Sequence, residues 1–207
     1  MFQFEMLKSA CEQFLHDEID KSNCIGFYKF SQIYNLNKVQ RAAKYILNHN
    51  FKEIVHGPEF LQLDVGGLIE YISDDRIHVK NEDPIFEAVV KWVEHHESRK
   101  ELFEEVLRHV RLPYCSDGFL RYGVQNHKLM QTEKCQSLLD EAKFFHMQPD
   151  KQTEIYSSRT RPRIDFKVWN TLVHVGGMVE ECSSLKSCLY LVGESQAWEL
   201  LAQLPNQ

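Results

Sequence analysis

The sequence predicts an all-α fold of stacked antiparallel helical hairpins, followed by a linker and a short β tail. Apolar residues recur at helical spacing through the first 148 positions, and cap and turn residues separate these stretches. Near Thr171 the pattern changes to one rich in β-branched and aromatic residues, which is typical of strands. Each helical stretch has one apolar stripe, so we expect successive helices to bury their stripes against one another.

The clearest hairpin lies between residues 81 and 113. Ser98 stands three residues before Glu101, a spacing that predicts mutual capping at the start of a helix, and Pro113 ends that helix. A connection of about two to four residues makes the two helices antiparallel neighbours. Their apolar stripes are Phe86, Val89, Val90 and Val93 in the first helix, and Phe103, Val106, Leu107 and Val110 in the second.

Three short helices are predicted within the first fifty residues. Asn23 is placed to cap the second and Asn37 to cap the third. Pro58 then suits the first position of a short helix, and Asp64 is placed to cap a helix over residues 65–72. The apolar residues of these helices are Leu7, Ala10, Cys11 and Phe14 on one face of the first, Phe27, Phe30 and Tyr34 in the second, and Val39, Ala42, Ala43, Ile46 and Leu47 in the third.

Two further helices are predicted after the hairpin. Ser116 is placed to cap a short one, and Thr132 a longer one that ends near Met147, before Pro149. The buried stripe of the longer helix is expected to contain Cys135, Leu138, Leu139, Ala142 and Phe145.

The last sixty residues lose the helical pattern. Residues 149–168 have almost no apolar periodicity and are predicted to be a linker, in which Arg159, Arg161 and Arg163 lie in solvent. Strands are predicted over residues 171–175 and 187–192, with a turn at the glycine pair 176–177. A tail of so few strands has to pack on something or belong to a longer unit, because isolated hairpins are marginal in water.

Composition limits the classes of function. The chain has 207 residues, enough for one domain and an appendage, and 30 acidic against 24 basic residues give a net charge of −6. This balance argues against a nucleic-acid or anionic-membrane partner. The start resembles no signal peptide, and no apolar run approaches the ~18 residues of a membrane span. The six cysteines are Cys11, Cys24, Cys115, Cys135, Cys182 and Cys188. They form no CxxC pair, so we expect buried, reduced thiols and a cytoplasmic location for the protein.

No catalytic residue, cofactor-binding residue or metal ligand is predicted. His95 and His96 are adjacent on a helix and point about 100° apart, so we expect solvated histidines and not a shared metal ion. No nucleophile-elbow motif occurs, and the glycine pair 176–177 is too sparse for a phosphate loop. Trp92 follows Val89 by three residues and is predicted to lie at the edge of the core; the alternative is an exposed partner anchor.

Six segments of the helical part stand out in order: LKSACEQFL, NC at 23–24, EFLQLD at 59–64, FEAVVKWV, HVRLP at 109–113 and LLDEAKFFH at 138–146. Together they resemble the BACK domain of kelch-like proteins. The tail, with VHVGG at residues 173–177 and WELLAQLP at 198–205, is similar to the start of a first kelch blade. The resemblance implies helices joining a BTB domain to BACK over residues 1–35, a BACK domain over 36–148, a linker over 149–168 and a partial blade over 169–207.

This resemblance implies a substrate adaptor of a cullin-3 RING ubiquitin ligase. In that family a BTB domain dimerises and grips the cullin, BACK spaces the parts, and a kelch propeller holds the protein substrate. Nothing before Met1 supplies a BTB domain and only one incomplete blade follows the linker, so we expect a truncated isoform or a fragment. The expected partner is the cullin-3 scaffold; a protein substrate would bind through the missing propeller, and neither nucleic acid nor membrane is expected.

Such an adaptor has no reacting groups, because it works by tethering a substrate near the loaded enzyme and so raising its effective concentration. Family position and aromatic density make Phe27, Tyr28 and Phe30 the expected cullin contacts. Two alternatives stay open: a cytoskeletal or structural scaffold built on the same architecture, and a truncated decoy that competes with the full protein for a partner.

Overall fold

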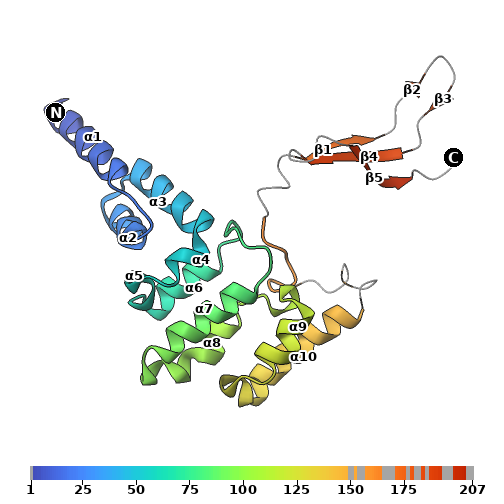
Figure 1. Cartoon of the computed structure of the whole chain (residues 1–207). Helices are drawn as coiled ribbons and strands as arrows, with labels where there is room; N and C mark the ends of the chain where they lie inside the picture. Colours follow the sequence, from blue (N-terminus) through green and yellow to red (C-terminus); the bar gives the residue numbers. More distant parts are fainter. Residues whose placement is uncertain are drawn as a thin grey trace. The chain divides into compact units, whose positions relative to one another are not determined.

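The computed structural model contains a helical unit and a unit of strands (Figure 1). It describes residues 2–148, 152 and 157–164, together with strands between positions 171 and 203. The first compact unit covers Met1–Arg163 and the second covers Ile164–Gln207. The predicted fold class, helical hairpins followed by a short β tail, is confirmed.

Helices of very different length make up the first unit (Figure 1). Between Glu97 and Gln131 the described chain contains three-ten turns and a π turn, labelled η, that alternate with short α segments. In chain order the elements are α1 (Phe2–Asp17), α2 (Cys24–Tyr34), α3 (Asn37–His49), α4 (Phe51–Ile54), α5 (Pro58–Leu61), α6 (Val65–Ile72), α7 (Asp83–Glu94), η1 (Glu97–Leu102), α8 (Phe103–Leu107), η2 (Leu112–Tyr114), α9 (Asp117–Phe119), η3 (Leu120–Val124), η4 (Lys128–Gln131) and α10 (Glu133–Met147).

Some helix starts follow the predicted chemistry. Pro58 is the first residue of α5, where its missing N–H is not needed. Thr132 caps α10, and its Oγ1 accepts a hydrogen bond from the Cys135 N–H at 3.3 Å. Asp64 occupies the N-cap position of α6 in extended conformation, but its side chain makes no capping hydrogen bond there. Pro58 and Thr132 therefore act as the sequence predicts, whereas Asp64 matches the prediction in position only.

Two predicted caps are wrong. Asn37 is already the first residue of α3, and the cap position before it is held by Leu36. Asn23 does occupy the cap position of α2, but its side chain bonds backwards, accepting from the Asp20 N–H at 2.8 Å and donating to the Glu18 carbonyl at 2.9 Å. In both cases a carboxylate from elsewhere in the fold reaches the helix start instead, which local sequence does not reveal.

The central hairpin forms with the expected short turn but with a different second arm. Only residues 95 and 96 separate α7 from η1, so the two arms are neighbours. The second arm begins as a three-ten turn at Glu97 with His96 in the cap position, which places Ser98 inside the turn. The predicted mutual capping of Ser98 and Glu101 is therefore wrong.

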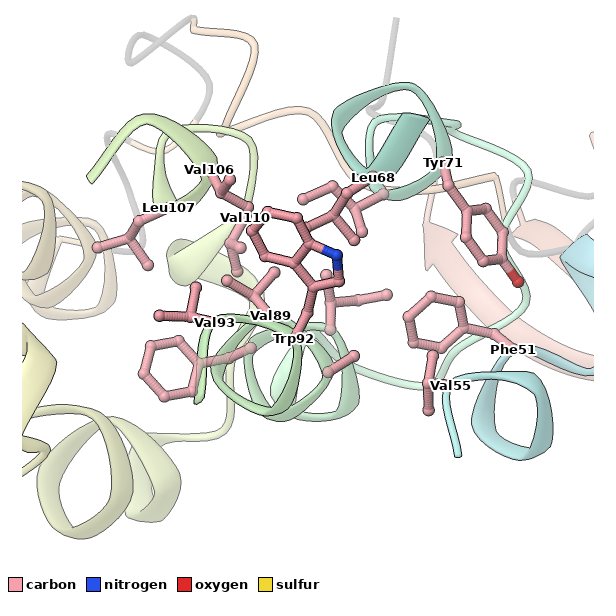
Figure 2. Packing of buried hydrophobic residues seen from close by; sticks show 14 of the residues in the cluster. Phe51, Val55, Leu68, Tyr71, Val89, Trp92, Val93, Val106, Leu107 and Val110 are labelled. Atoms are coloured by element: carbon pink, nitrogen blue, oxygen red, sulfur yellow. The ribbon is translucent and has the colours of Figure 1, made fainter. Parts of the chain in front are cut away.

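One continuous hydrophobic cluster extends from the start of α2 to α10. Figure 2 shows its middle, where the valines of α7 and α8 lie on one side of Trp92 and Tyr71 and Phe51 on the other. The predicted stripe of α7 is buried at Phe86, Val89 and Val93. Helices that share one close-packed cluster move together, because such interiors transmit strain and contain few voids.

Trp92 is in the core and is not an exposed anchor: only 1% of it is exposed. Its indole Nε1–H donates to the Leu63 carbonyl at 2.9 Å, which joins α7 to the turn between α5 and α6. The Arg99 guanidinium lies 4.1 Å from the ring centre and donates to the Leu61 carbonyl at 2.8 Å. A hydrogen bond from the indole N–H and a cation–π contact with Arg99 therefore hold the Trp92 ring in place within the core.

The strands of the second unit form two antiparallel sheets (Figure 1). The predicted strands at residues 171–175 and 187–192 are confirmed, whereas the turn predicted at residues 176–177 lies outside the described residues. A register shift between Cys188 and Leu189 marks a bulge in the pairing of the last two strands. One sheet has the order β1–β4–β5, with β1 (Thr171–Val175), β4 (Ser187–Val192) and β5 (Trp198–Gln203); the other pairs β2 (Met178–Val179) with β3 (Ser183–Ser184).

None of the helices that the structure describes has the length and apolar character needed to span a bilayer.

We predict that Trp92→Ala lowers the free energy of unfolding by about 3–5 kcal/mol, because it removes a buried aromatic ring and leaves a cavity. Urea denaturation of the full chain, followed by circular dichroism, measures this change. Trp92→Phe fills most of the space and loses the indole donor, so its expected loss is about 1–3 kcal/mol. Tyr122→Ala is the control, since Tyr122 is 79% exposed. Equal midpoints for Trp92→Ala and this control would contradict the central position of Trp92.

Candidate functional site

The described residues contain no group of three or more histidine, cysteine, aspartate or glutamate side chains placed to hold a metal ion. His95 and His96 are both exposed at the turn after α7, with ring centres 5.8 Å apart and the rings nearly perpendicular. This is the arrangement expected for solvated histidines.

A groove of about 500 Å³ runs along α7, with Phe86 and Phe119 among its lining residues. Several of the polar groups around it are engaged in contacts within the chain. Lys91 Nζ lies 2.8 Å from His56 Nδ1, and His127 Nδ1 accepts from the Leu129 N–H at 3.3 Å. Desolvation lowers the pKa of His127, so this ring is neutral at physiological pH. These contacts give the groove's polar residues a structural role, and the candidate site lies on the surface instead.

Large apolar side chains are exposed on the first three helices. Ile33 is 72% exposed, Phe14 66% and Leu7 62%. Single exposed apolar residues are ordinary, but a series on consecutive helices of one unit indicates an interaction surface. The exposed residues on these helices are Met6, Leu7 and Phe14 of α1, Phe30, Ile33 and Tyr34 of α2, and Tyr45 of α3.

α2 has two distinct faces. Cys24 and Ser31 are buried and lie on the side of the helix that packs on the unit. Phe30, Ile33 and Tyr34 stand at i, i+3 and i+4, so they share the opposite side, which faces solvent. The rings of Phe30 and Tyr34 are 4.5 Å apart. An apolar stripe therefore faces outward from a helix that the unit already holds.

The start of α2 is capped by a residue from another helix. Glu59 of α5 places its Oε2 3.1 Å from the Ile25 nitrogen and 3.2 Å from the Gly26 nitrogen, so one carboxylate accepts both N–H groups. A negative charge at a helix N-terminus also interacts favourably with the helix dipole. A Cβ at Gly26 would lie 2.8 Å from Glu59 Oε1, so any other residue at this position would push the Glu59 carboxylate aside.

The inner side of α2 is tied down by further polar contacts. Tyr28 donates through its hydroxyl to Glu70 at 3.0 Å, and the Lys44 ammonium lies 4.7 Å from the Tyr28 ring centre. Desolvation, and next the hydrogen bond to Glu70, raise the pKa of Tyr28 to about 12, so the hydroxyl stays a donor at physiological pH. At the C-terminal end Asn35 adopts the left-handed conformation, with φ 52°, that closes many helices.

The three predicted contact residues do not share one face. Phe30 is exposed and Phe27 is half-buried, and their spacing of three places them on neighbouring positions of the outward side. Tyr28 points inward to Glu70. The structure thus brings Phe27 and Phe30 together and gives Tyr28 a role in positioning the helix.

Sequence reasoning placed Tyr34 in the second helix but identified neither Ile33 nor Tyr34 as a surface residue. The signal was present, because Phe30, Ile33 and Tyr34 form an i, i+3, i+4 set. Periodicity reports that a stripe exists but not whether another helix covers it.

For α1, too, periodicity does not show which side of the helix is covered by another helix. Leu7, Cys11 and Phe14 form the predicted inward stripe, but in the structure they are exposed. α1 instead reaches α3 with its other side, where Glu12 Oε1 accepts from the Lys38 N–H at 3.1 Å and supplies the cap that Asn37 does not. The apolar stripe of α1 is therefore available to a partner.

We predict that Glu59→Ala lowers the free energy of unfolding by about 0.5–2 kcal/mol, the range for loss of a helix cap. Hydrogen exchange of the Ile25 and Gly26 amides should quicken, because both lose their acceptor. Glu59→Gln is the matched control, since it keeps an acceptor of the same size and is expected to lose less. Unchanged exchange at both amides in Glu59→Ala would refute the cap.

The described cysteines differ in exposure. Cys24, Cys115 and Cys135 are buried, as predicted, but Cys11 is exposed with the α1 stripe. Burial, and next the charge of Glu59, raise the pKa of Cys24 to about 12. Burial likewise raises the pKa of Cys115 and Cys135.

A raised pKa means less thiolate, the reactive form, at any pH below it. We therefore predict that iodoacetamide at pH 8 alkylates Cys11 rapidly and Cys24, Cys115 and Cys135 only after denaturation. Peptide mass spectrometry resolves each site. Alkylation of Cys24 at the rate of Cys11 in the folded chain would contradict the burial of the α2 start.

Comparison with known families supports a family assignment for the helical unit. Residues 24–125 match the family model BACK, described as BTB And C-terminal Kelch. The matched range begins with the first residue of α2 and ends one residue after η3. It therefore includes the outward stripe of α2, the Glu59 cap and the Trp92 core.

Proposed function

Residues 24–125 form a BACK domain of the kind found in kelch-like proteins, and from this premise we propose that the chain is a spacer and interaction module of a substrate adaptor for a cullin-3 RING ubiquitin ligase. The module is non-catalytic in this proposal. The single observation that carries the proposal is the outward apolar stripe of α2, on a helix whose other side is fixed to the unit.

In this role the helical unit holds other parts at a fixed distance and takes no part in the reaction itself. An adaptor accelerates modification by holding a substrate near the loaded enzyme, and its gain depends on how narrowly the connection restricts the substrate. A continuous core from α2 to α10 supports a stiff connection, because close-packed helices resist bending. The rigidity of the core thus has a direct functional use.

The proposed cullin contact is the outward side of α2. Phe30, Ile33 and Tyr34 present aromatic and branched apolar groups, which are the kinds of side chain that anchor protein interfaces. Phe27 extends this stripe by one turn, and Tyr28 positions the helix through Glu70. Because the Glu59 cap and the Tyr28 contact already order α2, binding would order few further groups, which favours affinity.

α1 is proposed as a second edge of the same contact region. Leu7 and Phe14 are exposed over two turns of this helix, and family position assigns the helices before residue 36 to the junction with a BTB domain. That assignment, with the homodimer formed through BTB and the cytoplasmic location, is part of the proposal.

The strands after residue 170 support the proposed partial kelch blade. β1, β4 and β5 form one antiparallel sheet in which each strand pairs with the next one in the order. Propeller blades are sheets of four antiparallel strands, so these three strands suit part of one blade. In the proposal a protein substrate binds through a propeller to which this blade belongs.

Two alternatives use the same BACK domain without ligase activity. A cytoskeletal scaffold would not co-purify with a cullin, whereas an adaptor would. A decoy would bind the cullin or the full-length protein and lower substrate ubiquitination when co-expressed.

We predict that Phe30→Ala with Ile33→Ala weakens binding of the chain to the cullin-3 N-terminal region at least about tenfold, since each anchor contributes more than about 1 kcal/mol. Phe27→Ala with Tyr28→Ala is also expected to weaken it, through the stripe and through helix positioning. A quantitative pull-down or calorimetry measures the loss.

The matched control for this experiment is Tyr122→Ala with Met147→Ala. Both residues are 79% exposed, but they lie on η3 and α10. If both α2 variants keep the wild-type circular dichroism and bind as tightly as this control, α2 is not the contact and the assignment is wrong.

A further inference from the structure

The segment predicted to be a solvated linker contains a buried ion pair. The Arg163 side chain is 5% exposed and its partner Glu82 is 2% exposed, with Nη2 and Oε2 3.0 Å apart. The predicted solvation of the three arginines is therefore wrong for Arg163, and also for Arg159, whose side chain is 27% exposed; Arg161 is 57% exposed. A buried charge needs a partner, so Arg163 and Glu82 depend on each other.

Arg163 bridges the end of one helix and the start of the next. Its Nη2 donates to the Ile72 carbonyl at 2.8 Å and its Nη1 to the Asp74 carbonyl at 2.6 Å, both at the C-terminal end of α6. Glu82 is the residue immediately before α7. A guanidinium at carbonyls left without helical partners is a favourable arrangement. The Arg163 side chain thus connects the end of α6 with the residue that precedes α7.

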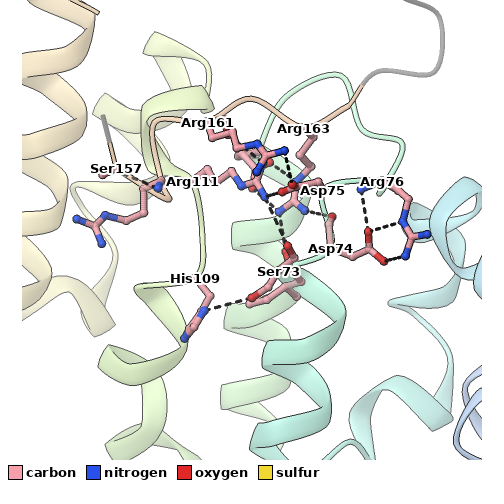
Figure 3. Close-up of polar contacts among 12 residues, drawn as sticks. Ser73, Asp74, Asp75, Arg76, His109, Arg111, Ser157, Arg161 and Arg163 are labelled. Carbon is pink, nitrogen blue, oxygen red and sulfur yellow. Dashed lines mark hydrogen bonds and ion pairs between the residues drawn. The ribbon is translucent and has the colours of Figure 1, made fainter. Parts of the chain in front are cut away.

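A second buried arginine holds the backbone of this segment. Arg111, whose side chain is 7% exposed, pairs with Asp75 and donates through Nη1 to the Arg161 carbonyl at 2.9 Å. The Tyr114 hydroxyl donates to the neighbouring Thr160 carbonyl at 2.7 Å. Figure 3 shows Arg111, Arg161 and Arg163 gathered around Asp75. The contacts come from residues on both sides of the start of η2.

The third attachment is to α10. Arg159 donates to Glu141 Oε2 through Nε at 3.1 Å and Nη2 at 2.8 Å. Within the segment, the Ser157 N–H donates to the Thr160 hydroxyl at 2.7 Å, which closes a tight turn. The segment therefore has internal hydrogen bonds in addition to its contacts with the helices.

We propose that residues 157–163 are a strap that locks three parts of the helical unit together: the α6–α7 loop, the region of η2, and α10. The strap fixes the point at which the chain leaves the helical unit. That this fixed exit point helps to position a substrate rests on the proposed adaptor function. The strap itself rests only on the contacts above and does not involve α2.

A double-mutant cycle on the full chain tests the central pair. Glu82→Met or Arg163→Met alone leaves an unpaired buried charge, so each is expected to lower Tm by about 5–10 °C. The double variant replaces both charges by apolar groups, and we expect its Tm to be no lower than that of either single variant. The matched control is Asp117→Met with Arg121→Met, an exposed pair of the same chemistry, whose effects should be small and additive.

Limited trypsin digestion tests whether the pair holds the strap. In the wild-type chain we expect slow cleavage after Arg159 and Arg163, and in Glu82→Met, which keeps both cleavage sites, a rate roughly tenfold higher as the strap opens. Glu82→Gln serves if Glu82→Met does not fold. Additive Tm losses in the cycle, or equal cleavage rates in wild type and variant, would overturn the strap.

The same samples separate this proposal from the adaptor function. The strap variants that stay folded are expected to bind the cullin fragment as wild type does. Absence of cullin binding in every sample, with a non-additive cycle, would reject the adaptor function and leave the strap standing.

Discussion

The helical unit depends on how Trp92 is buried. Its ring fills the middle of the core, its N–H is taken by the Leu63 carbonyl, and the Arg99 guanidinium stacks on the ring. These three contacts bring α7, the α5–α6 turn and η1 to one point. Burial of the ring supplies most of the stabilisation, while the hydrogen bond satisfies a donor that would otherwise be lost in the interior. From this point one apolar cluster continues outward to α2 and α10.

α2 packs on this core through Cys24 and Ile25, which belong to the cluster. Polar contacts add to this attachment: Glu59 accepts from the start of the helix, and Tyr28 donates to Glu70. On the other side, Phe30, Ile33 and Tyr34 face water. An apolar face left uncovered would ordinarily reduce solubility, so such an arrangement favours a partner that covers it. The BACK match and this geometry support the same kind of function, protein interaction.

At the other end of the unit, charge replaces apolar contact as the means of attachment. Arg111 and Arg163 each satisfy a carboxylate together with backbone carbonyls, so the strap is held without a hydrophobic residue of its own. Buried pairs of this kind contribute little net stability but strongly penalise any arrangement that separates them. They therefore specify one path for the chain where the apolar pattern specifies none.

The local content of the fold could be read directly from the sequence. The stripes of α7 and α10, the caps at Pro58 and Thr132, and the strands at residues 171–175 and 187–192 depend on residues close together in the chain, which is why their prediction succeeded. The exposure of Leu7 and Phe14, the cap that Glu59 gives α2, and the pairing of Arg163 with Glu82 across 81 positions could not be read in this way. Periodicity determines which side of a helix is apolar. Only the tertiary structure decides whether another helix covers that side, because burial and charge pairing depend on neighbours that come from distant parts of the chain.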